Sequence, residues 1–379
     1  MKYTWLPAIV MLTLFSLIMA YGFIPDFARL GIKRLGSGLD DYRIFENRIV
    51  ETGTAQPWAI SPRYNKKKLS FRHRKLLSGL MTVSFLVIRN NEILHEQYWK
   101  SYTGASVSNS FSIAKSIVSL LTGAALQEGR IRGLDQPAGD FIPEFRSGGR
   151  ERITIRHLLA MSSGLGWNES YLNPFSMNAE AYFGGGLKRL VGSLPVAGAP
   201  GRRYRYSSAD TQILAEVIER ATGTSLSRYA SEKLWKPLGA ATPALWSLDG
   251  RDGTERAFCC FNSTARDFAR IGQLILNGGA WRGDRIIPKK YLDEATAPRA
   301  DMTDAAGRPV DYYGYQFWIM RHRGLTIPYA RGIRGQYIFV IPEKNAVVVR
   351  LGELRIEKMK NNTPLDAYEW IDAALSLME

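Results

Sequence analysis

The sequence predicts an α+β fold with one antiparallel sheet that is built from the two ends of the chain. Two apolar, β-branched segments, 82–99 and 336–351, each read as a pair of strands joined by a turn. The residues between them carry apolar side chains at helical spacing. Strands that bracket helices imply a sheet assembled from sequence-distant strands and flanked by helices, with a mainly helical subdomain inserted at about 130–260.

The individual strands and helices follow from local patterns. In the first strand pair, Thr82–Arg89 and Ile93–Trp99 flank an Asn-Asn turn. In the second, Gln336–Ile341 and Ala346–Leu351 flank a Pro-Glu-Lys-Asn turn. Amphipathic or buried helices are predicted at Ser112–Gly129, Ile155–Met161, Thr211–Ala221, Ala265–Leu276 and Pro364–Leu377. The folded domain is therefore expected to span 79–379.

The first 25 residues are predicted to enter a membrane. Between Lys2 and Asp26 there is no charged residue, and Trp5–Ile24 is an apolar stretch about long enough to span a bilayer. We interpret 1–25 as an anchor or signal segment, with residues 3–25 in contact with the membrane. A small-x-small site at Ala20 leaves cleavage open, and basic residues on both flanks leave the orientation open.

Basic residues exceed acidic ones by 50 to 35, which gives a net charge of +15. Much of the excess lies in 62–100, where nine basic and two acidic residues leave a net charge of +7. No zinc finger, RNA-recognition signature or basic helix with heptads accompanies it, so we predict no nucleic-acid partner. Residues 26–78, which contain few periodic apolar runs, are interpreted as a basic linker and irregular extension near the membrane.

Cysteine and histidine usage predicts neither a disulfide framework nor a metal site. The two cysteines, Cys259 and Cys260, are adjacent, and neighbouring cysteines rarely satisfy disulfide geometry. We expect both to be buried thiols. The four histidines show no HExxH or similar spacing, and His157 lies in an apolar helical pattern that favours a structural role. No metal and no bound cofactor is predicted.

Ser112 and Lys115 form the SxxK sequence of this chain, at the start of a predicted apolar helix. Positions three apart share a helix face, so the Lys115 amine can lie against the Ser112 hydroxyl. A lysine held neutral by burial can accept the hydroxyl proton and so activate the serine. The alternative reading of the same residues is a helix cap.

The surrounding segments resemble the serine β-lactamase and penicillin-binding superfamily, most closely its class C-like branch, which includes esterases and 6-aminohexanoate-dimer hydrolase. The resemblance runs from about Thr82 to Leu351 and rests on SIAKSIVSLLTGAALQEG at 112–129, ITIRHLLAMSSGL at 153–165, and shorter stretches downstream. It implies the β-lactamase-like fold and an acyl-enzyme mechanism on Ser112.

The resemblance also implies roles for the residues of a second motif, which is YxN or YxS in this family. Tyr206, Ser207 and Ser208 occupy it here. Tyr206 is expected to share with Lys115 the tasks of deprotonating Ser112 and protonating the leaving group, since a nearby ammonium favours the phenolate. Ser208 is a candidate substrate-binding residue, and it departs from the asparagine of most penicillin-recognising members.

The family's third motif, KTG or HxG, is absent, and Arg331, Gly332 and Ile333 stand in its place. This alignment implies an oxyanion hole formed by the backbone amides of Ser112 and Ile333, with Gly332 letting the substrate approach the strand. Arg331 or Arg334 can pair with a substrate carboxylate or lie on the surface. Trp167 and Tyr315 are candidate pocket-lining aromatics.

The predicted function is a serine hydrolase that cleaves an amide or ester, possibly one that bears a carboxylate, through an acyl-enzyme on Ser112. A β-lactamase or D-Ala carboxypeptidase is the alternative within enzymes, and a non-catalytic binding module is the alternative outside them. The partners predicted are a small-molecule substrate and the membrane, with the oligomeric state left open. The catalytic domain is expected outside the cytoplasm.

Overall fold

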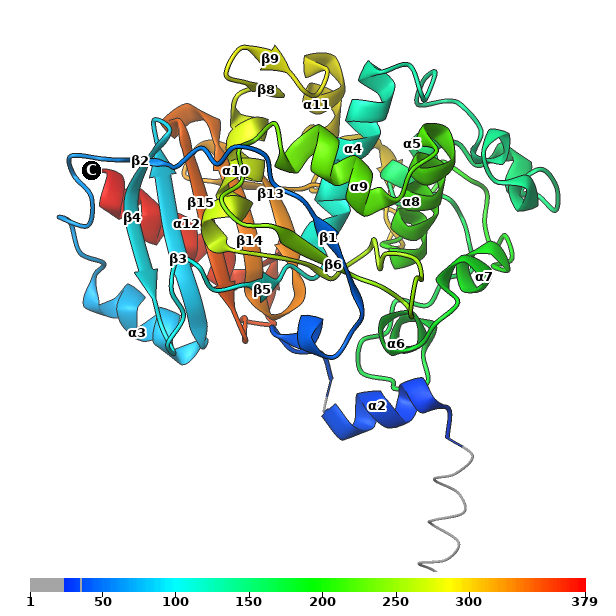
Figure 1. Ribbon diagram of the computed structural model, residues 1–379, viewed down its shortest axis with the longest axis horizontal. Helices are drawn as coiled ribbons and strands as arrows, with labels where there is room; N and C mark the ends of the chain where they lie inside the picture. The colour runs from blue at the N-terminus through cyan, green and yellow to red at the C-terminus, as the bar shows by residue number, and fades with distance from the viewer. Residues whose placement is uncertain (1–23, 35) are drawn as a thin grey trace, which may run out of the picture.

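A seven-stranded sheet forms the centre of the computed structural model, which describes residues 24–34 and 36–379 (Figure 1). The strands follow the order β12-β13-β14-β15-β3-β4-β2, and all neighbours are antiparallel except β2 and β4. Their bounds are Trp318–His322 (β12), Leu325–Gly332 (β13), Gln336–Ile341 (β14), Ala346–Gly352 (β15), Thr82–Arg89 (β3), Glu92–Tyr98 (β4) and Ala59–Ile60 (β2).

The predicted closure of the sheet by sequence-distant strands is confirmed. Strand β15 pairs with β3 over seven residues, from Ala346 opposite Arg89 to Gly352 opposite Thr82. Every residue of β15 and all but the last of β3 are buried, because helices cover both faces of the sheet. The predicted bounds of β3 and β14 match the structure, whereas β12 and β13 were not predicted as separate strands.

Helix α10 (Ala265–Leu276) packs against β14 and β15 on one face of the sheet. Gly272 permits this contact, because a Cβ atom there would lie 2.4 Å from a methyl carbon of Val347. Helices α12 (Leu365–Met378) and α3 (Phe71–Gly79) cover the other face, where the ring of Trp370 lies tilted against that of Phe85, with ring centres 6.4 Å apart. Both α10 and α12 lie where their periodicity predicts them.

The helical subdomain lies beside the sheet and is organised around α4 (Ile113–Gln127) and α8 (Ser208–Thr222), which contact each other. It includes α5 (Ile155–Leu159), α6 (Met177–Phe183), α7 (Leu187–Gly192), α9 (Leu226–Ala230) with the π-helical turn Ser231–Trp235, and α11 (Lys289–Ala295). Of these helices, α4 and α11 lie outside the span of about 130–260 expected for the subdomain. Thr154 and His157 form a capping box at α5, so His157 has the predicted structural role.

Smaller sheets complete the fold. Four strands in the order β1-β6-β7-β5 join the N-terminal segment to the subdomain: Asn47–Val50 (β1), Ala244–Ser247 (β6), Phe261–Ser263 (β7) and Ser108–Asn109 (β5). Three two-stranded ribbons pair Ala280–Trp281 (β8) with Asp284–Arg285 (β9), Arg299–Thr303 (β10) with Pro309–Val310 (β11), and Met359–Lys360 (β16) with Thr363–Pro364 (β17). Short 3₁₀ turns link these elements.

Residues 26–78, expected to be a linker and irregular extension, contain ordered elements that pack on the body. Helix α2 (Asp26–Arg34) lies against α6, and β1 pairs with β6 (Figure 1). Val50, Leu69 and Leu77 from this segment are buried in the core. These elements are too short to show a clear periodicity in sequence, so their folded structure depends on contacts with distant residues.

Most of the predicted membrane segment, 1–23, lies outside the described residues. Among the described helices, none combines the length and the apolar composition that crossing a bilayer demands.

Candidate active site

The predicted nucleophile lies at the amino end of α4. Ser112 is the residue before the helix and is half-buried, and Phe111 before it has φ of 46°, a left-handed value that is uncommon for a bulky residue. The Phe111 amide donates to Asn109 Oδ1 at 2.9 Å, which holds this turn in place. The helix amino end therefore presents the Ser112 hydroxyl where developing negative charge is favoured.

Lys115 lies one turn further along α4, with its amine directed at Ser112. Lys115 Nζ donates to Ser112 Oγ at 3.1 Å and to the backbone carbonyl of Phe258 at 2.8 Å. Only 1% of Lys115 is exposed, and this burial lowers its pKa to about 8, although the negative charge of Glu169 opposes the shift. A large fraction of Lys115 is therefore neutral in mildly alkaline solution and able to accept a proton.

Tyr206 faces the same two residues from the segment before α8. The Lys115 amine lies 5.0 Å from the centre of the Tyr206 ring. Burial, and then the charge of Glu169, raise the pKa of the Tyr206 hydroxyl, while a hydrogen bond with Ser112 and the charge of Arg331 oppose the shift. The net shift of the Tyr206 pKa is therefore upward, opposite to the expected bias toward the phenolate, because burial outweighs the groups that favour the charged form. Tyr206 holds its proton and is suited to give it up as an acid.

The end of strand β13 closes the other side of the site. A Cβ on Gly332 would lie 2.4 Å from the backbone oxygen of Ser110, so glycine allows the strand to lie directly against the Ser110–Ser112 turn. Ser112 and Ile333 line one common cavity. Among the described residues, neither of their amides donates to a backbone carbonyl. This arrangement fits the predicted pair of oxyanion donors.

Glu169 is a central residue of the site that sequence reasoning missed. Its carboxylate accepts hydrogen bonds from Trp167 Nε1 at 2.6 Å, from the Tyr171 hydroxyl at 2.6 Å, and from both the amide and the hydroxyl of Ser208 at 2.8 Å. It sits in an irregular loop, and no periodicity or motif marks it. Glu169 connects Ser208 to the loop over the cavity and raises the pKa of both Lys115 and Tyr206.

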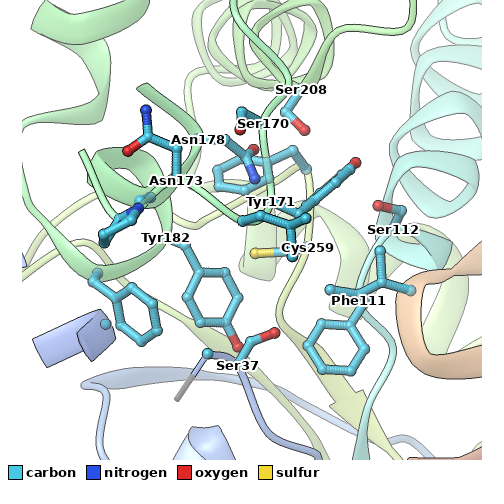
Figure 2. A pocket seen from close by; sticks show the side chains of 18 of the residues that line it. Ser37, Phe111, Ser112, Ser170, Tyr171, Asn173, Asn178, Tyr182, Ser208 and Cys259 are labelled. Atoms are coloured by element: carbon cyan, nitrogen blue, oxygen red, sulfur yellow. The ribbon is translucent and has the colours of Figure 1, made fainter. Parts of the chain in front are cut away.

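A cavity of about 390 Å³ opens beside Ser112 (Figure 2). Ser208 and Tyr171 line it together with Phe258 and Cys259. The described lining includes no acidic or basic side chain. Most of the remaining lining residues come from α2 and the turn after it, from α6, and from the loop between α5 and α6, with Phe111 before α4 and Ile333 after β13: Gly31, Ile32, Gly36, Ser37, Phe111, Ser170, Leu172, Asn173, Pro174, Asn178, Ala179, Tyr182, Phe183 and Ile333.

Four predicted substrate contacts lie elsewhere. Arg331 stacks 3.3 Å from the ring centre of Trp318 and donates to the carbonyl of Asn362, and Arg334 donates to the carbonyl of Glu353. Trp167 is buried and holds Glu169. Tyr315 is buried with its hydroxyl bound by Arg156. None of the four lines this cavity, although the charge of Arg331 reaches the site and opposes the rise in the pKa of Tyr206.

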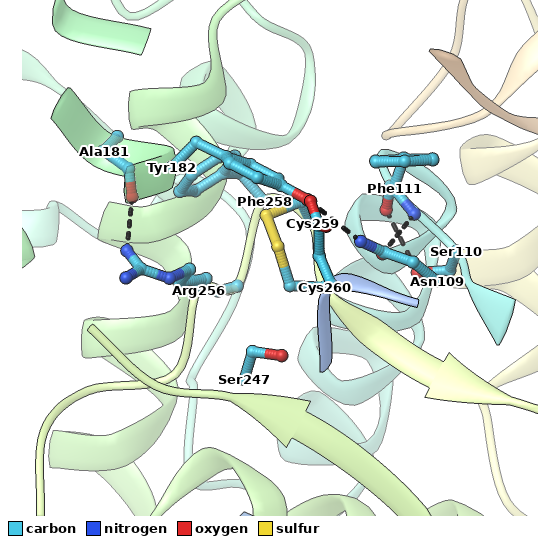
Figure 3. Close-up of a disulfide and its surroundings, with 12 residues drawn as sticks. Asn109, Ser110, Phe111, Ala181, Tyr182, Ser247, Arg256, Phe258, Cys259 and Cys260 are labelled. Atoms are coloured by element: carbon cyan, nitrogen blue, oxygen red, sulfur yellow. Dashed lines mark hydrogen bonds between the residues drawn. A yellow bond between two sulfur atoms is a disulfide. The ribbon is translucent and has the colours of Figure 1, made fainter. Parts of the chain in front are cut away.

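The prediction of two free thiols is wrong, because Cys259 and Cys260 are joined by a disulfide (Figure 3). Cys260 has φ of 66°, a left-handed conformation in which the two neighbouring side chains meet on one side of the chain. The disulfide follows Phe258, whose carbonyl binds Lys115, and precedes β7. Within the described ranges, no three His, Cys, Asp or Glu side chains come together as a metal site.

Comparison with known proteins agrees with this geometry. The sequence model of the Beta-lactamase family matches residues 73–360. The chain is 29% identical over 291 residues to 6-aminohexanoate-dimer hydrolase of Paenarthrobacter ureafaciens, which covers 73% of each chain. It is 31% identical over 169 residues to Esterase EstB of Burkholderia gladioli, covering 38% of this chain and 41% of that one.

Solved structures share the fold. A candidate 6-aminohexanoate-dimer hydrolase from Bacillus anthracis superposes with a TM-score of 0.72 at 22% identity, covering 88% of this chain and 89% of that one. A family VIII carboxylesterase superposes with a TM-score of 0.63 at 18% identity, covering 85% of this chain and 99% of that one.

Proposed function

The chain belongs to the beta-lactamase family, and we propose that it is the hydrolase of an ester or amide that forms an acyl-enzyme on Ser112. The observation that carries this proposal is the buried Lys115 amine, 3.1 Å from Ser112 Oγ, with its pKa lowered to about 8. Relatives that bear the names hydrolase and esterase support the same reaction type.

Acylation begins when Ser112 Oγ attacks the substrate carbonyl carbon and passes its proton to neutral Lys115. The carbonyl oxygen becomes an oxyanion and accepts hydrogen bonds from the amides of Ser112 and Ile333. As the tetrahedral centre collapses, the bond to the alcohol or amine breaks, and the leaving group takes a proton from the Tyr206 hydroxyl. The proton held by Lys115 then restores Tyr206, so one proton has moved from serine to leaving group.

Deacylation reverses these roles. Water adds to the acyl carbon while its proton passes to the Lys115 and Tyr206 pair, and the bond to Ser112 Oγ breaks. The serine regains its proton, and a carboxylic acid leaves. Ser208 and Glu169 hold the loop around the acyl group through the two hydrogen bonds at 2.8 Å.

Attachment to a membrane through residues 3–25, with the catalytic domain outside the cytoplasm, is part of the same proposal. The uncharged stretch before Asp26 supports the anchor. The disulfide of Cys259 and Cys260 supports an oxidising compartment, where such bonds persist.

The test is the intact mass of the full-length protein after reaction with a fluorophosphonate probe and, separately, with a penicillin. We expect a probe adduct on the wild type and on Ser116→Ala, a serine one turn along α4 that binds the Gln316 carbonyl, and none on Ser112→Ala. A penicillin adduct would instead favour a β-lactamase or D-Ala carboxypeptidase. No adduct on folded protein would overturn the mechanism and favour a binding module.

A further inference from the structure

The cavity beside Ser112 has a mouth rimmed by exposed apolar residues. Leu172 is 97% exposed, Tyr171 48% and Ile32 42%, and all three line the cavity. Phe175, on the same loop, is also exposed. Exposed apolar side chains that cluster at the opening of an uncharged cavity mark a surface that meets an apolar partner. A scattered exposed residue such as Phe71 on α3 carries no such meaning.

The same mouth lies next to the end of the apolar segment. Trp5–Ile24 is followed by Pro25 and then by α2, and Gly31 and Ile32 of α2 line the cavity. A helix rises about 1.5 Å per residue, so the mouth lies within about 10 Å of the first residue of α2 along its axis. If the segment is embedded, the opening is at the level of the lipid headgroups.

Helix α2 is held in this position by buried polar contacts. Arg34 at its end pairs with the buried Asp41 at 2.7 Å, and Asp41 also accepts a hydrogen bond from the Tyr182 hydroxyl at 2.8 Å. Tyr182 in turn accepts from Asn109, which fixes the turn before Ser112 (Figure 3). A continuous set of hydrogen bonds therefore connects the first described helix to Phe111, the residue before the nucleophile.

We propose that the substrate is a membrane-resident amphiphile whose uncharged aliphatic acyl chain enters the cavity from the bilayer, past Ile32 and Leu172, to reach Ser112. This inference rests on the proposed function and names its substrate class. The absence of acidic and basic side chains from the described lining favours a chain without charge. The acyl part stays bonded to Ser112 after the leaving group departs, so apolar contacts with it act in both steps.

The first experiment compares p-nitrophenyl decanoate with p-nitrophenyl acetate, using full-length protein in detergent. We expect kcat/KM to be at least about tenfold higher for the decanoate, because each buried methylene adds to binding. In an Ile32→Asp/Leu172→Asp variant this ratio is expected to fall about tenfold. The control Phe71→Asp places an aspartate on an exposed apolar site of α3, away from the cavity, and keeps the wild-type ratio.

The second experiment asks where the substrate comes from. Full-length protein is mixed with phosphatidylcholine and phosphatidylglycerol vesicles that carry the decanoate, and we expect it to sediment with the vesicles and hydrolyse the ester. Protein that stays in the supernatant would overturn the membrane source. The acyl-chain assignment would be overturned if the wild type hydrolysed decanoate and acetate with similar kcat/KM, or if the double variant kept the wild-type ratio. In either case a fluorophosphonate adduct on Ser112 would still uphold the proposed function.

Discussion

Burial of the Lys115 side chain lowers its pKa and so favours its neutral form. The side chain is almost fully enclosed, its two hydrogen bonds go to Ser112 and the Phe258 carbonyl, and its pKa falls to about 8. The negative charge of Glu169 acts on both groups: it raises the pKa of Lys115 against the effect of burial, and it raises the pKa of Tyr206 in the same direction as burial. One carboxylate thus tunes both the base and the acid of the proposed mechanism.

This arrangement predicts how kcat/KM depends on pH. Because Lys115 acts in its neutral form, kcat/KM for p-nitrophenyl acetate should rise as pH rises through about 8. In Glu169→Gln the charge that raises the pKa of Lys115 is gone, so the rise should move to lower pH. Rates measured from pH 5.5 to 10 test both statements.

Glu144→Gln is the matched control, because Glu144 is an exposed glutamate of the subdomain outside the cavity lining, and its profile should coincide with that of the wild type. If kcat/KM of Glu169→Gln rose at the same pH as in the wild type, Glu169 would not raise the pKa of Lys115.

Among the elements, β13 and α4 come together through a single small residue. Gly332 has φ of −112°, which any residue can adopt, so glycine is needed here for space rather than for backbone freedom. A Cβ would meet the Ser110 oxygen at 2.4 Å and the Phe111 Cβ at 3.1 Å. The separation of the Ser112 and Ile333 amides therefore depends on this contact.

Gly332→Ala should push the strand away from the turn and misplace one of the two oxyanion donors. We expect a loss of about 10²-fold in kcat for p-nitrophenyl acetate, in the range of removing an oxyanion donor. Steady-state kinetics and thermal unfolding on the same samples measure the effect.

The control is Gly79→Ala at the end of α3, where a Cβ would meet nothing within 4 Å and activity should be kept. If Gly332→Ala retains wild-type kcat, the strand does not supply an oxyanion donor.

Over the whole molecule, Arg350 joins the parts of the chain that form the sheet. It is fully buried on β15, and it donates to the carbonyls of Leu80, Gly335 and Leu354 at 2.7 to 3.0 Å and to Thr82 Oγ1. Leu80 and Thr82 lie at the start of β3, whereas Gly335 follows β13 and Leu354 follows β15, so one guanidinium binds groups from sequence-distant parts of the chain.

Arg350→Met should leave those carbonyls without donors and lower the free energy of unfolding by about 3–5 kcal/mol, because each buried carbonyl left without a donor costs about 1–3 kcal/mol. Urea denaturation followed by tryptophan fluorescence measures the change. Arg321→Met, at a side chain that is 66% exposed, should stay within about 0.5 kcal/mol of the wild type. Equal stability of the two variants would contradict the role of Arg350.

Features that depend on residues close together in the chain could be predicted from the sequence. The apolar residue patterns of β3, β14 and α10 predict these elements where the structure has them. Ser112 and Lys115 lie together because they are three positions apart at the start of a helix. Other features became visible only in the folded structure: the position of Glu169 beside Ser208, the bond between Cys259 and Cys260, and α2 on the cavity wall. Local sequence patterns do not predict such contacts, because the burial of a side chain, its bonding partners and the charges around it are set only when separate segments pack together.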